Sequence, residues 1–351
     1  MSRISSTPTV RDVAAAANVS IGVASVVLRD VESSIRVSPR TRDRVRSEAA
    51  RLGYTPNHAA RALRTGRTHA IGVAVRQLRS PFFAAVVEGI EATCRAAGYH
   101  LLLGHVQSNE RTEREIVGLF ARGRIDGLLV AGELPHDAQV IQMALERGIP
   151  TVLVARPAVG SAPGVTLDHA SAIGLALDHL AQLGHRSVAL RMAADPASTP
   201  VSRARVELAR AYAASKGWPP PLAFDADHLG ADGLRTWLMG AVAADPPLTA
   251  VLASDAVAAH LLKAAEAAQI PVPGRLSIVA LDGTEVTTYT TPELTSVSQP
   301  LEELGAAGVQ LLLGLIGPPY QRPQLAQPAA TTLLAPAFTV RGSTGPAPRA
   351  A

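Results

Sequence analysis

The chain has 351 residues, of which 47% are hydrophobic but only 3% are aromatic, so alanine, valine and leucine must fill its cores. At roughly 150 residues per domain this length predicts two or three domains, and the aliphatic composition favours helices packed on parallel strands. The single cysteine, the polar stretch from Met1 to Arg11 and the lack of an apolar run of ~18 residues indicate a cytoplasmic protein with no intrachain disulfide and no membrane partner.

Positive charge is concentrated at the N-terminus. Residues 1–69 hold 12 arginines and 5 acidic residues, a net charge of +7, whereas the remaining residues hold 21 basic and 24 acidic ones, a net charge of −3. This segment is suited to a polyanionic partner, because clustered cations are what neutralise phosphates. A solvated arginine-rich face is the alternative interpretation of charge alone.

Two short helices are predicted within this basic segment. Thr9 can cap the first, which ends at Ala17, and Asn18 tolerates the left-handed conformation that a tight turn needs. Ser20 can accept a hydrogen bond from the first amides of a second helix, Ile21 to about Arg29.

The second helix has one face that can pack and one that stays free. On a helical wheel Ala24, Val27 and Leu28 share the first face, and the opposite face holds Gly22, Ser25, Val26 and Arg29. A third helix fits residues 38–52, with Ser38 as cap and Gly53 at its end. The pattern predicts a helix-turn-helix whose second helix can enter the major groove of DNA; a purely structural three-helix unit is the alternative, and the basic charge favours DNA.

Two separated motifs carry a resemblance to a known family. The first runs from Thr9-Val-Arg-Asp-Val-Ala through Ala17-Asn-Val-Ser20 to Ser25 and Val27, and the second is Gly53-Tyr-Thr-Pro-Asn57 followed by Ala60-Arg-Ala-Leu63. In order and spacing this pattern resembles the lac and purine repressor family, and the resemblance extends to about Gly342. It implies a DNA-binding transcriptional repressor with an effector-binding body of the periplasmic sugar-binding fold.

The segment after the third helix matches the family's hinge helix. In that family a leucine of the hinge enters the minor groove at the centre of the operator, and the matching residue here is Leu63. Residues 57–64 are fewer than the ~12–15 that an isolated helix needs in water, so we expect this helix to form only on DNA, with Arg61, Arg64 and Arg67 near phosphates. A plain linker helix is the alternative.

The second helix departs from the family at the positions that usually read bases. Ile21, Gly22 and Val26 stand there, and none of them can hydrogen-bond a base edge, although Ile21 and Val26 could contact thymine methyl groups. We therefore expect specificity to rest more on DNA shape and on the hinge. The predicted DNA-binding residues are Thr9, Ser20, Ile21, Gly22, Ser25, Val26, Arg29, Asn57, Arg61, Leu63 and Arg64.

From Ala70 onward short apolar strands alternate with helical stretches. The first series has strands near 71–75, 101–103, 127–130 and 151–154, with helices at 82–97, 111–122 and 138–147; the second begins at 165–167 and reaches 276–281. Two such series predict two Rossmann-like lobes with parallel sheets, and ligands bind at the carboxyl ends of their strands. A helix over 301–315 is expected to return to the first lobe.

The predicted fold class is thus an all-α helix-turn-helix headpiece joined to an α/β, two-lobed, periplasmic-binding-protein-like body. The headpiece covers 1–56 and the hinge with its linker 57–69. The effector-binding and dimerisation domain covers 70–342, with lobe one at about 70–165 and 300–325 and lobe two at about 166–298 and 326–342. The proline- and alanine-rich residues 343–351 are expected to form a disordered tail.

Effector contacts are predicted by position in the family pattern. Phe82 matches an aromatic residue that lies against the ligand, and Asp168, Asp255 and Asp282 follow strands, where carboxylates suit sugar hydroxyls but suit helix caps equally well. The family's arginine matches Arg205 only loosely, with Arg203 as a rival.

Signals for catalysis are poor, and we expect no cofactor and no metal. The chain has no HExxH, GxxxxGK[ST] or GxSxG motif, and Cys94 is expected to be a packed thiol. The sequence predicts a homodimeric repressor that binds a palindromic double-stranded operator and responds to a small effector, a sugar or related metabolite. A metabolite-binding protein or enzyme with the same body, and a nucleoid-type DNA binder that ignores effectors, are the alternatives.

Overall fold

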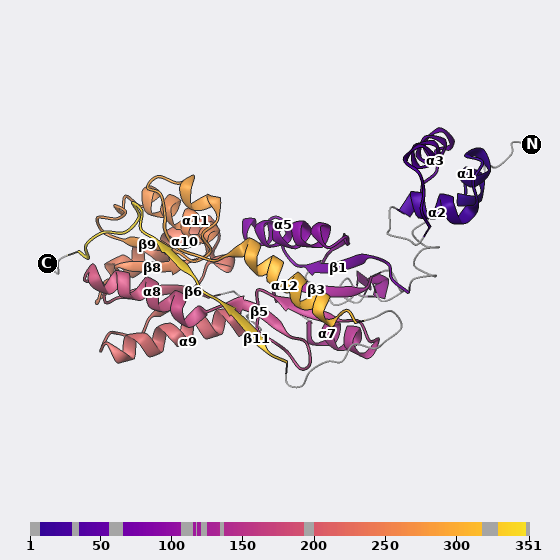
Figure 1. Cartoon of the computed structure of the whole chain (residues 1–351). Helices are drawn as coiled ribbons and strands as arrows, with labels where there is room; N and C mark the ends of the chain where they lie inside the picture. The colour runs from indigo at the N-terminus through magenta and orange to yellow at the C-terminus, as the bar shows by residue number, and fades with distance from the viewer. Residues whose placement is uncertain are drawn as a thin grey trace, which may run out of the picture. The chain divides into compact units, whose positions relative to one another are not determined.

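The computed structural model describes residues 8–29, 35–55, 66–106, 115–116, 118–120, 125–133, 137–192, 200–317 and 329–348. The chain divides into two compact units, residues 1–68 and 69–351, here called the headpiece and the body (Figure 1). Residues 57–65 of the expected hinge and most of the helix expected over 111–122 lie outside the described residues.

The headpiece consists of α1 (Val10–Ala16), α2 (Ile21–Arg29) and α3 (Pro39–Leu52). Thr9 caps α1 in a reciprocal arrangement with Asp12: the Asp12 N–H donates to the Thr9 hydroxyl, and the Thr9 N–H donates to the Asp12 carboxylate at 2.8 Å. Ser20 accepts from the Val23 N–H at 3.2 Å at the start of α2. Ser38 caps α3 as predicted.

One small core holds the three helices together. Asn18 takes a positive φ of 50° in the turn, and α1 and α2 are bent by 109° relative to each other, within the range expected for a helix-turn-helix. Among the described residues no single helix is long and apolar enough to cross a membrane; α1 and α2 pass that test only as this bent pair. The buried residues of the core are Val13, Ala14, Ala17, Ala24, Val27, Val45 and Ala49.

The first lobe of the body is built on a parallel sheet with strand order β11-β5-β4-β3-β1-β2. Its inner strands are apolar and buried along their whole length, as expected when helices cover both faces. The helices described in this lobe are α5 (Pro81–Ala96), α7 (Asp137–Glu146) and α12 (Leu301–Leu315). The strands are β1 (Ala70–Val75), β2 (His100–His105), β3 (Gly127–Ala131), β4 (Thr151–Val154), β5 (Gly164–Leu167) and β11 (Thr331–Leu334).

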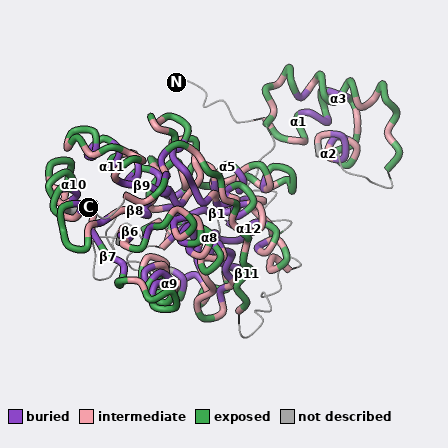
Figure 2. Tube along the Cα trace, turned by 90° about the vertical axis from the view of Figure 1, so that its left-hand side faces the viewer, coloured by how far each residue is buried: buried purple, intermediate pink, exposed green. Residues whose placement is uncertain are grey.

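The second lobe has the strand order β12-β10-β9-β8-β6-β7, parallel except for β12, which runs antiparallel to β10. Figure 2 shows the inner strands of the body as buried and the outer sides of its helices as exposed. The strands are β6 (Val188–Met192), β7 (Leu222–Asp225), β8 (Ala250–Ala253), β9 (Ser277–Ala280), β10 (Thr295–Ser298) and β12 (Ala337–Thr339). The helices are α8 (His169–Gln182), α9 (Pro200–Ser215), α10 (Ala226–Ala243), α11 (Asp255–Ala267) and the short 3-10 helix η1 (Glu285–Thr288).

The chain passes between the lobes after β5, after β10 and after β11, and Figure 1 shows β11 and β12 following each other from one lobe to the other. One predicted lobe boundary is wrong, because β11 was expected in lobe two but pairs with β5 in the first sheet. The predicted boundary at about residue 165 falls within β5, all of which belongs to the first sheet. The apolar pattern of a buried strand is the same in either sheet, so it gives no information on which sheet the strand joins.

The predicted disordered tail is wrong for residues 343–348. Ser343 is fully buried, and its hydroxyl accepts from the Thr295 N–H at 2.9 Å and donates to the Ile278 carbonyl at 2.6 Å. The Ala347 N–H donates to the Leu183 carbonyl at 2.7 Å. A segment with few apolar side chains is therefore held by backbone and hydroxyl hydrogen bonds, which composition does not predict.

Candidate functional site

The helix expected to read DNA exposes part of its predicted face. Ile21 is 49% exposed and Gly22 is exposed, while Ser25 is half-buried. The hydroxyls of Thr9 and Ser20 take part in the helix caps of α1 and α2. These two residues therefore fix the starts of the helices, whatever further contacts they make.

Val26 does not belong to the free face, which corrects the prediction. It is only 7% exposed. The side chain of Ile35, in the loop before α3, lies 3.9 Å from the position that a Cβ of Gly22 would occupy, and Gly22 and Val26 are neighbours one turn apart. Ile35 thus lies on the same side of α2 as Gly22, and a helical wheel of α2 alone gives no information on neighbours from outside the helix.

Positive charge surrounds the described part of the headpiece. Arg51 is paired with Glu48 at 2.7 Å, and the exposed arginines are Arg11, Arg36, Arg40, Arg44, Arg46 and Arg51. The predicted contacts Asn57, Arg61, Leu63 and Arg64, and the side chain of Arg29, lie outside the described residues and stay predictions. A small helical unit with this charge is suited to the phosphate backbone of DNA.

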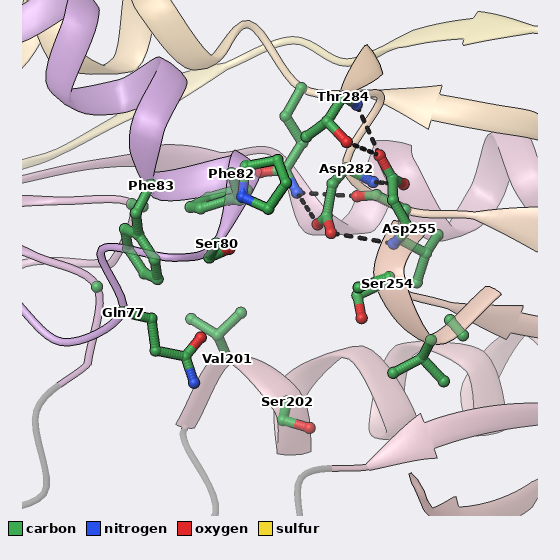
Figure 3. Close-up of a pocket in the computed structure, with 18 of the residues that line it drawn as sticks. Gln77, Ser80, Phe82, Phe83, Val201, Ser202, Ser254, Asp255, Asp282 and Thr284 are labelled. Carbon is green, nitrogen blue, oxygen red and sulfur yellow. Dashed lines mark hydrogen bonds between the residues drawn. The ribbon is translucent and has the colours of Figure 1, made fainter. Parts of the chain in front are cut away.

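The body contains a cavity of about 720 Å³ between its two lobes. It lies where loops leave the carboxyl ends of strands in both sheets, as expected for this topology. Figure 3 shows Phe82 and Phe83 on one side of it and Asp255, Asp282 and Thr284 on the other, with Val201 and Ser202 at the start of α9.

The first-lobe wall of the cavity is aromatic. The rings of Phe82 and Phe83 meet edge to face, with centroids 4.9 Å apart, at the start of α5. Gly132, at a positive φ of 76°, allows this arrangement, because a Cβ there would lie 2.4 Å from the Phe83 ring. Phe82 therefore lines the cavity as predicted, and Phe83 joins it.

Asp255 lines the cavity but is occupied by the protein itself, contrary to its predicted role as an effector contact. It is 2% exposed. One carboxylate oxygen accepts from the N–H groups of Asp282 and Gly283 at 3.0 and 3.3 Å, and the other accepts from the N–H and hydroxyl of Thr284. These bonds use all the acceptor positions of a carboxylate, so Asp255 fixes the loop after β9 rather than a ligand.

Asp282 keeps acceptor capacity toward the cavity. Its oxygens accept from the Asp255 N–H and from the Gln299 side-chain amide, each at 3.2 Å, and the Gln299 amide also donates to the Leu281 carbonyl. Burial, reinforced by the nearby Asp255 charge and opposed by Arg205, raises the pKa of Asp282 to about 6. Each oxygen retains a lone pair for a hydroxyl donor.

Arg205 lines the cavity and His169 holds it. The Arg205 Nε–H donates to His169 Nδ1 at 3.3 Å, and burial, with the Arg205 charge as a second cause, lowers the pKa of His169 to about 3. The rival arginine, Arg203, is exposed and does not line the cavity. The position favoured by the family pattern is therefore the one at the cavity.

Asp168 does not line the cavity, which corrects a second predicted effector contact. Its carboxylate caps α8, accepting from the Ser171 N–H at 3.0 Å and the Ser171 hydroxyl at 2.6 Å. These hydrogen bonds lower its pKa. A carboxylate just before a helix serves as its N-cap, and the next residue, His169, is the one that reaches the cavity.

Glu133 and His105 also line the cavity, although neither was among the predicted effector contacts. The Glu133 carboxylate, on the loop after β3, accepts from the Val201 N–H at 3.1 Å and so joins the first lobe to the N-terminus of α9. His105 Nε2 lies 3.0 Å from the Arg76 carbonyl. Both residues follow or end a first-lobe strand, and the strand-end rule that selected Asp255 and Asp282 also applies to them.

Comparison with known protein families matches both units. Residues 9–57 match the bacterial regulatory proteins of the lacI family, and residues 177–344 match the periplasmic binding protein-like domain. The transcriptional repressor CytR of Escherichia coli is 29% identical over 320 residues, covering 87% of this chain and 89% of that protein. The ribose operon repressor of Escherichia coli is 27% identical over 341 residues, covering 95% of this chain and 99% of the repressor.

Solved structures are similar over nearly the whole chain. The lac repressor dimer bound to operator and the anti-inducer ONPF has a TM-score of 0.79 at 25% identity, covering 97% of this chain and 99% of that one. The complex of the transcriptional regulator CelR with cellobiose has a TM-score of 0.67 at 26% identity, covering 96% and 99%. The predicted fold class is confirmed, and these relatives are transcriptional regulators rather than enzymes. The chain thus carries a helix-turn-helix domain of the lacI family of bacterial regulatory proteins and a periplasmic-binding-protein-like domain.

Proposed function

We propose that the chain is a homodimeric transcriptional repressor that binds a two-fold operator and changes its DNA affinity when a small polyhydroxyl effector, a sugar or related metabolite, occupies the cavity of the body. The observation that carries this proposal is that one chain joins a basic helix-turn-helix headpiece to a two-lobed body whose cavity is lined by charged, polar and aromatic side chains. Two headpieces on a dimer suit two half-sites of one operator.

The DNA contacts follow from the headpiece. Ile21 and Gly22 at the start of α2 offer an apolar surface to thymine methyl groups, and the exposed arginines meet phosphates. Leu63 of the hinge enters the minor groove, with Asn57, Arg61 and Arg64 beside it. Contacts of this kind read the shape of the duplex as much as its base sequence.

The chemistry of the cavity supports a neutral polyhydroxyl effector. Arg205 supplies donors, Asp282 supplies acceptors and Phe82 supplies an apolar face, which are the groups that a sugar ring with hydroxyls can use together. The negative charges of Asp282 and Glu133 near Arg205 are balanced by the positive charges of Arg205 itself and Arg191. An effector that binds one relative orientation of the two lobes more tightly increases the population of that orientation. The change in orientation alters the spacing of the two headpieces in the dimer and therefore their affinity for DNA.

Genomic footprinting with the full chain, followed by a metabolite screen on the recovered DNA, tests this function. We expect affinity for recovered sites to exceed that for unrelated DNA at moderate ionic strength, and at least one sugar to change it. A similar salt dependence on all sequences, together with no ligand-induced shift in melting, would identify a non-specific DNA binder instead. Turnover of a metabolite without DNA retention would identify an enzyme.

A further inference from the structure

The contact between His169 and Arg205 defines the protonation of the imidazole. A guanidinium can only donate, so His169 Nδ1, which lies 3.3 Å from Arg205 Nε, must be the acceptor, and the ring proton must be on Nε2. His169 Nε2 lies 3.5 Å from the Thr166 hydroxyl, which can accept from it. The geometry therefore gives a neutral ring in one tautomer.

This chain of contacts runs through the connection between the lobes. Thr166 is in β5 of the first sheet, His169 is the first residue of α8, and Arg205 is in α9 of the second lobe. Both His169 and Arg205 line the cavity. The end of a first-lobe strand is thus linked through one imidazole to a cationic side chain in the wall of the second lobe.

We propose that His169 is a positioning residue of the effector cavity, which holds the Arg205 guanidinium through Nε and so presents its terminal N–H groups to the effector. This inference rests on the proposed function and adds a residue to its site. Among the described residues, His169 is the hydrogen-bond partner of the Arg205 side chain, and it is bonded through Nε. The terminal N–H groups therefore remain for a ligand in the cavity that Arg205 lines.

A neutral acceptor is the physical requirement at this position. Asp282 and Glu133 both act electrostatically on Arg205, from the second and the first lobe, and each attracts the guanidinium toward itself. An imidazole whose Nδ1 accepts from the Arg205 Nε–H holds the planar guanidinium without adding charge. A guanidinium fixed before binding loses less conformational entropy when the ligand arrives. A protonated His169 would repel Arg205 and lose the acceptor.

Nitrogen NMR of the full chain with ¹⁵N-labelled histidine tests the tautomer without any ligand. We expect His169 to keep an unprotonated Nδ1 and a protonated Nε2 from pH 8 down to pH 5, since its pKa is far below 6.5. His169→Gln identifies the resonance. An imidazole at position 169 that titrates near 6.5, or that carries its proton on Nδ1, overturns the proposal.

A double-mutant cycle tests the positioning role. D-ribose, D-glucose and cellobiose are titrated into the wild type, and the bound sugar is then titrated into His169→Leu, Arg205→Lys and the double variant. His169→Leu removes a hydrogen bond to a charged group, so we expect it to bind the sugar about tenfold more weakly than the wild type. Lys has no Nε–H, so adding His169→Leu to Arg205→Lys should weaken binding little further. Equal loss in both backgrounds overturns the proposal.

Conservative replacement separates positioning from a general structural effect. His169→Gln and His169→Asn keep a side-chain carbonyl that can accept from Arg205, so we expect affinity closer to wild type than in His169→Leu. His179→Asn, on the same helix but bonded to Thr344 rather than to the cavity, is the matched control and should leave sugar affinity unchanged. His169→Ala replaces the leucine variant if that variant does not fold.

The failure of this inference is distinct from the failure of the proposed function. If the wild type binds its operator but none of the three sugars, the sugar assignment fails while the NMR measurement still decides the role of His169. If a sugar binds and the cycle shows no coupling, His169 is not a positioning residue although the regulator stands. If no operator binding occurs at all, the proposed function fails first.

Discussion

Asp255 and Thr284 are joined twice through one carboxylate oxygen, which accepts from the Thr284 N–H at 2.6 Å and from its hydroxyl at 2.7 Å. Asp255 is the first residue of α11, and Thr284 is in the loop that follows β9. The pair therefore ties a helix of the second lobe to the loop that presents Asp282 to the cavity. We therefore expect substitution of Asp255 to lower the stability of the body and substitution of Asp282 to weaken effector binding.

Asp255→Ala should destabilise the body by roughly 2 kcal/mol or more, because it leaves the backbone N–H groups of the loop without an acceptor in a buried site. Urea unfolding measures the change. The matched control is Asp232→Ala: Asp232 is on the surface of α10, about 3.8 Å from Arg235, and its removal should change stability by less than about 0.5 kcal/mol. Equal stability of the two variants would contradict the assigned role of Asp255.

Asp282 should make effector affinity depend on pH. Its pKa in the folded chain is about 6, so below this pH the carboxylate is protonated and loses acceptor capacity. We expect affinity to fall by up to about tenfold per pH unit below 6, and Asp282→Asn to be weak but nearly independent of pH. Calorimetric titration at pH 5 to 8 measures both; a pH-independent wild type would exclude Asp282 as an ionised contact.

The raised pKa of Asp282 also determines how this residue changes the free energy of unfolding with pH. Because the folded-state pKa is raised above 3.8, the contribution of Asp282 to stability is complete below pH 3.8 and is lost as the pH rises through 6. The Asp282→Asn variant should therefore gain stability relative to the wild type as the pH rises across this range.

Much of the fold follows from sequence periodicity and capping chemistry. Thr9, Ser20, Ser38 and Gly53 marked the ends of the headpiece helices, because their side chains or backbone conformations satisfy helix termini locally. Buried strands were equally clear as apolar runs. Such signals depend only on residues close in sequence, which is why sequence reasoning could read them.

The errors concern contacts between distant segments. Val26 is buried although the wheel of α2 placed it on the free face, β11 pairs with β5, and Ser343 bonds to residues of β9 and β10. Among the predicted effector contacts, Asp168 and Asp255 resemble Asp282 in sequence, because each follows a strand. Only the fold decides which carboxylate caps a helix, which fixes a loop and which stays available to a ligand.

Close packing of α5 on α12 should not tolerate a methyl group. A Cβ at Gly89 would lie 2.0 Å from the Glu302 carbonyl oxygen, and one at Gly305 would lie 2.2 Å from the Val86 carbonyl oxygen. Gly305→Ala must separate the helices and should cost roughly 1–3 kcal/mol. Gly314→Ala, on the same helix with no atom within 4 Å of the added methyl, should instead stabilise by up to about 1 kcal/mol. Thermal unfolding of both variants measures this, and similar effects at the two sites would contradict it.

Two histidines should make the C-terminal segment sensitive to acid. His185 Nε2 donates to the Gly345 carbonyl, His179 Nε2 lies 2.9 Å from the Thr344 hydroxyl, and burial lowers the pKa of both rings below 6.5. Lowered histidine pKa values give stability that is complete above pH 6.5 and is lost as the pH falls below it. The melting temperature should therefore drop between pH 7 and pH 5, and drop less in a chain that ends at Gly342. An identical pH dependence in both chains would show that the segment is not involved.

Operator binding should depend on an apolar residue at the start of α2. Ile21→Ala removes the exposed side chain that can reach thymine methyl groups, and we expect roughly 1–3 kcal/mol weaker binding at sites that carry a thymine there. Leu63→Ala should also weaken operator binding, because the hinge loses its wedge, while effector affinity stays nearly intact. Fluorescence anisotropy with labelled operator at fixed salt concentration measures both variants.

Leu222→Ala is the matched control for Ile21→Ala, because Leu222 is similarly exposed, at 47%, but is in β7 of the body. Its DNA affinity should equal that of the wild type. The apolar contact also predicts that Ile21→Ala leaves the salt dependence of binding unchanged, whereas losing an arginine from α3 lowers the slope, because counterion release follows phosphate contacts and not methyl contacts. A reduced slope in Ile21→Ala would mean that α2 does not lie in the groove as proposed.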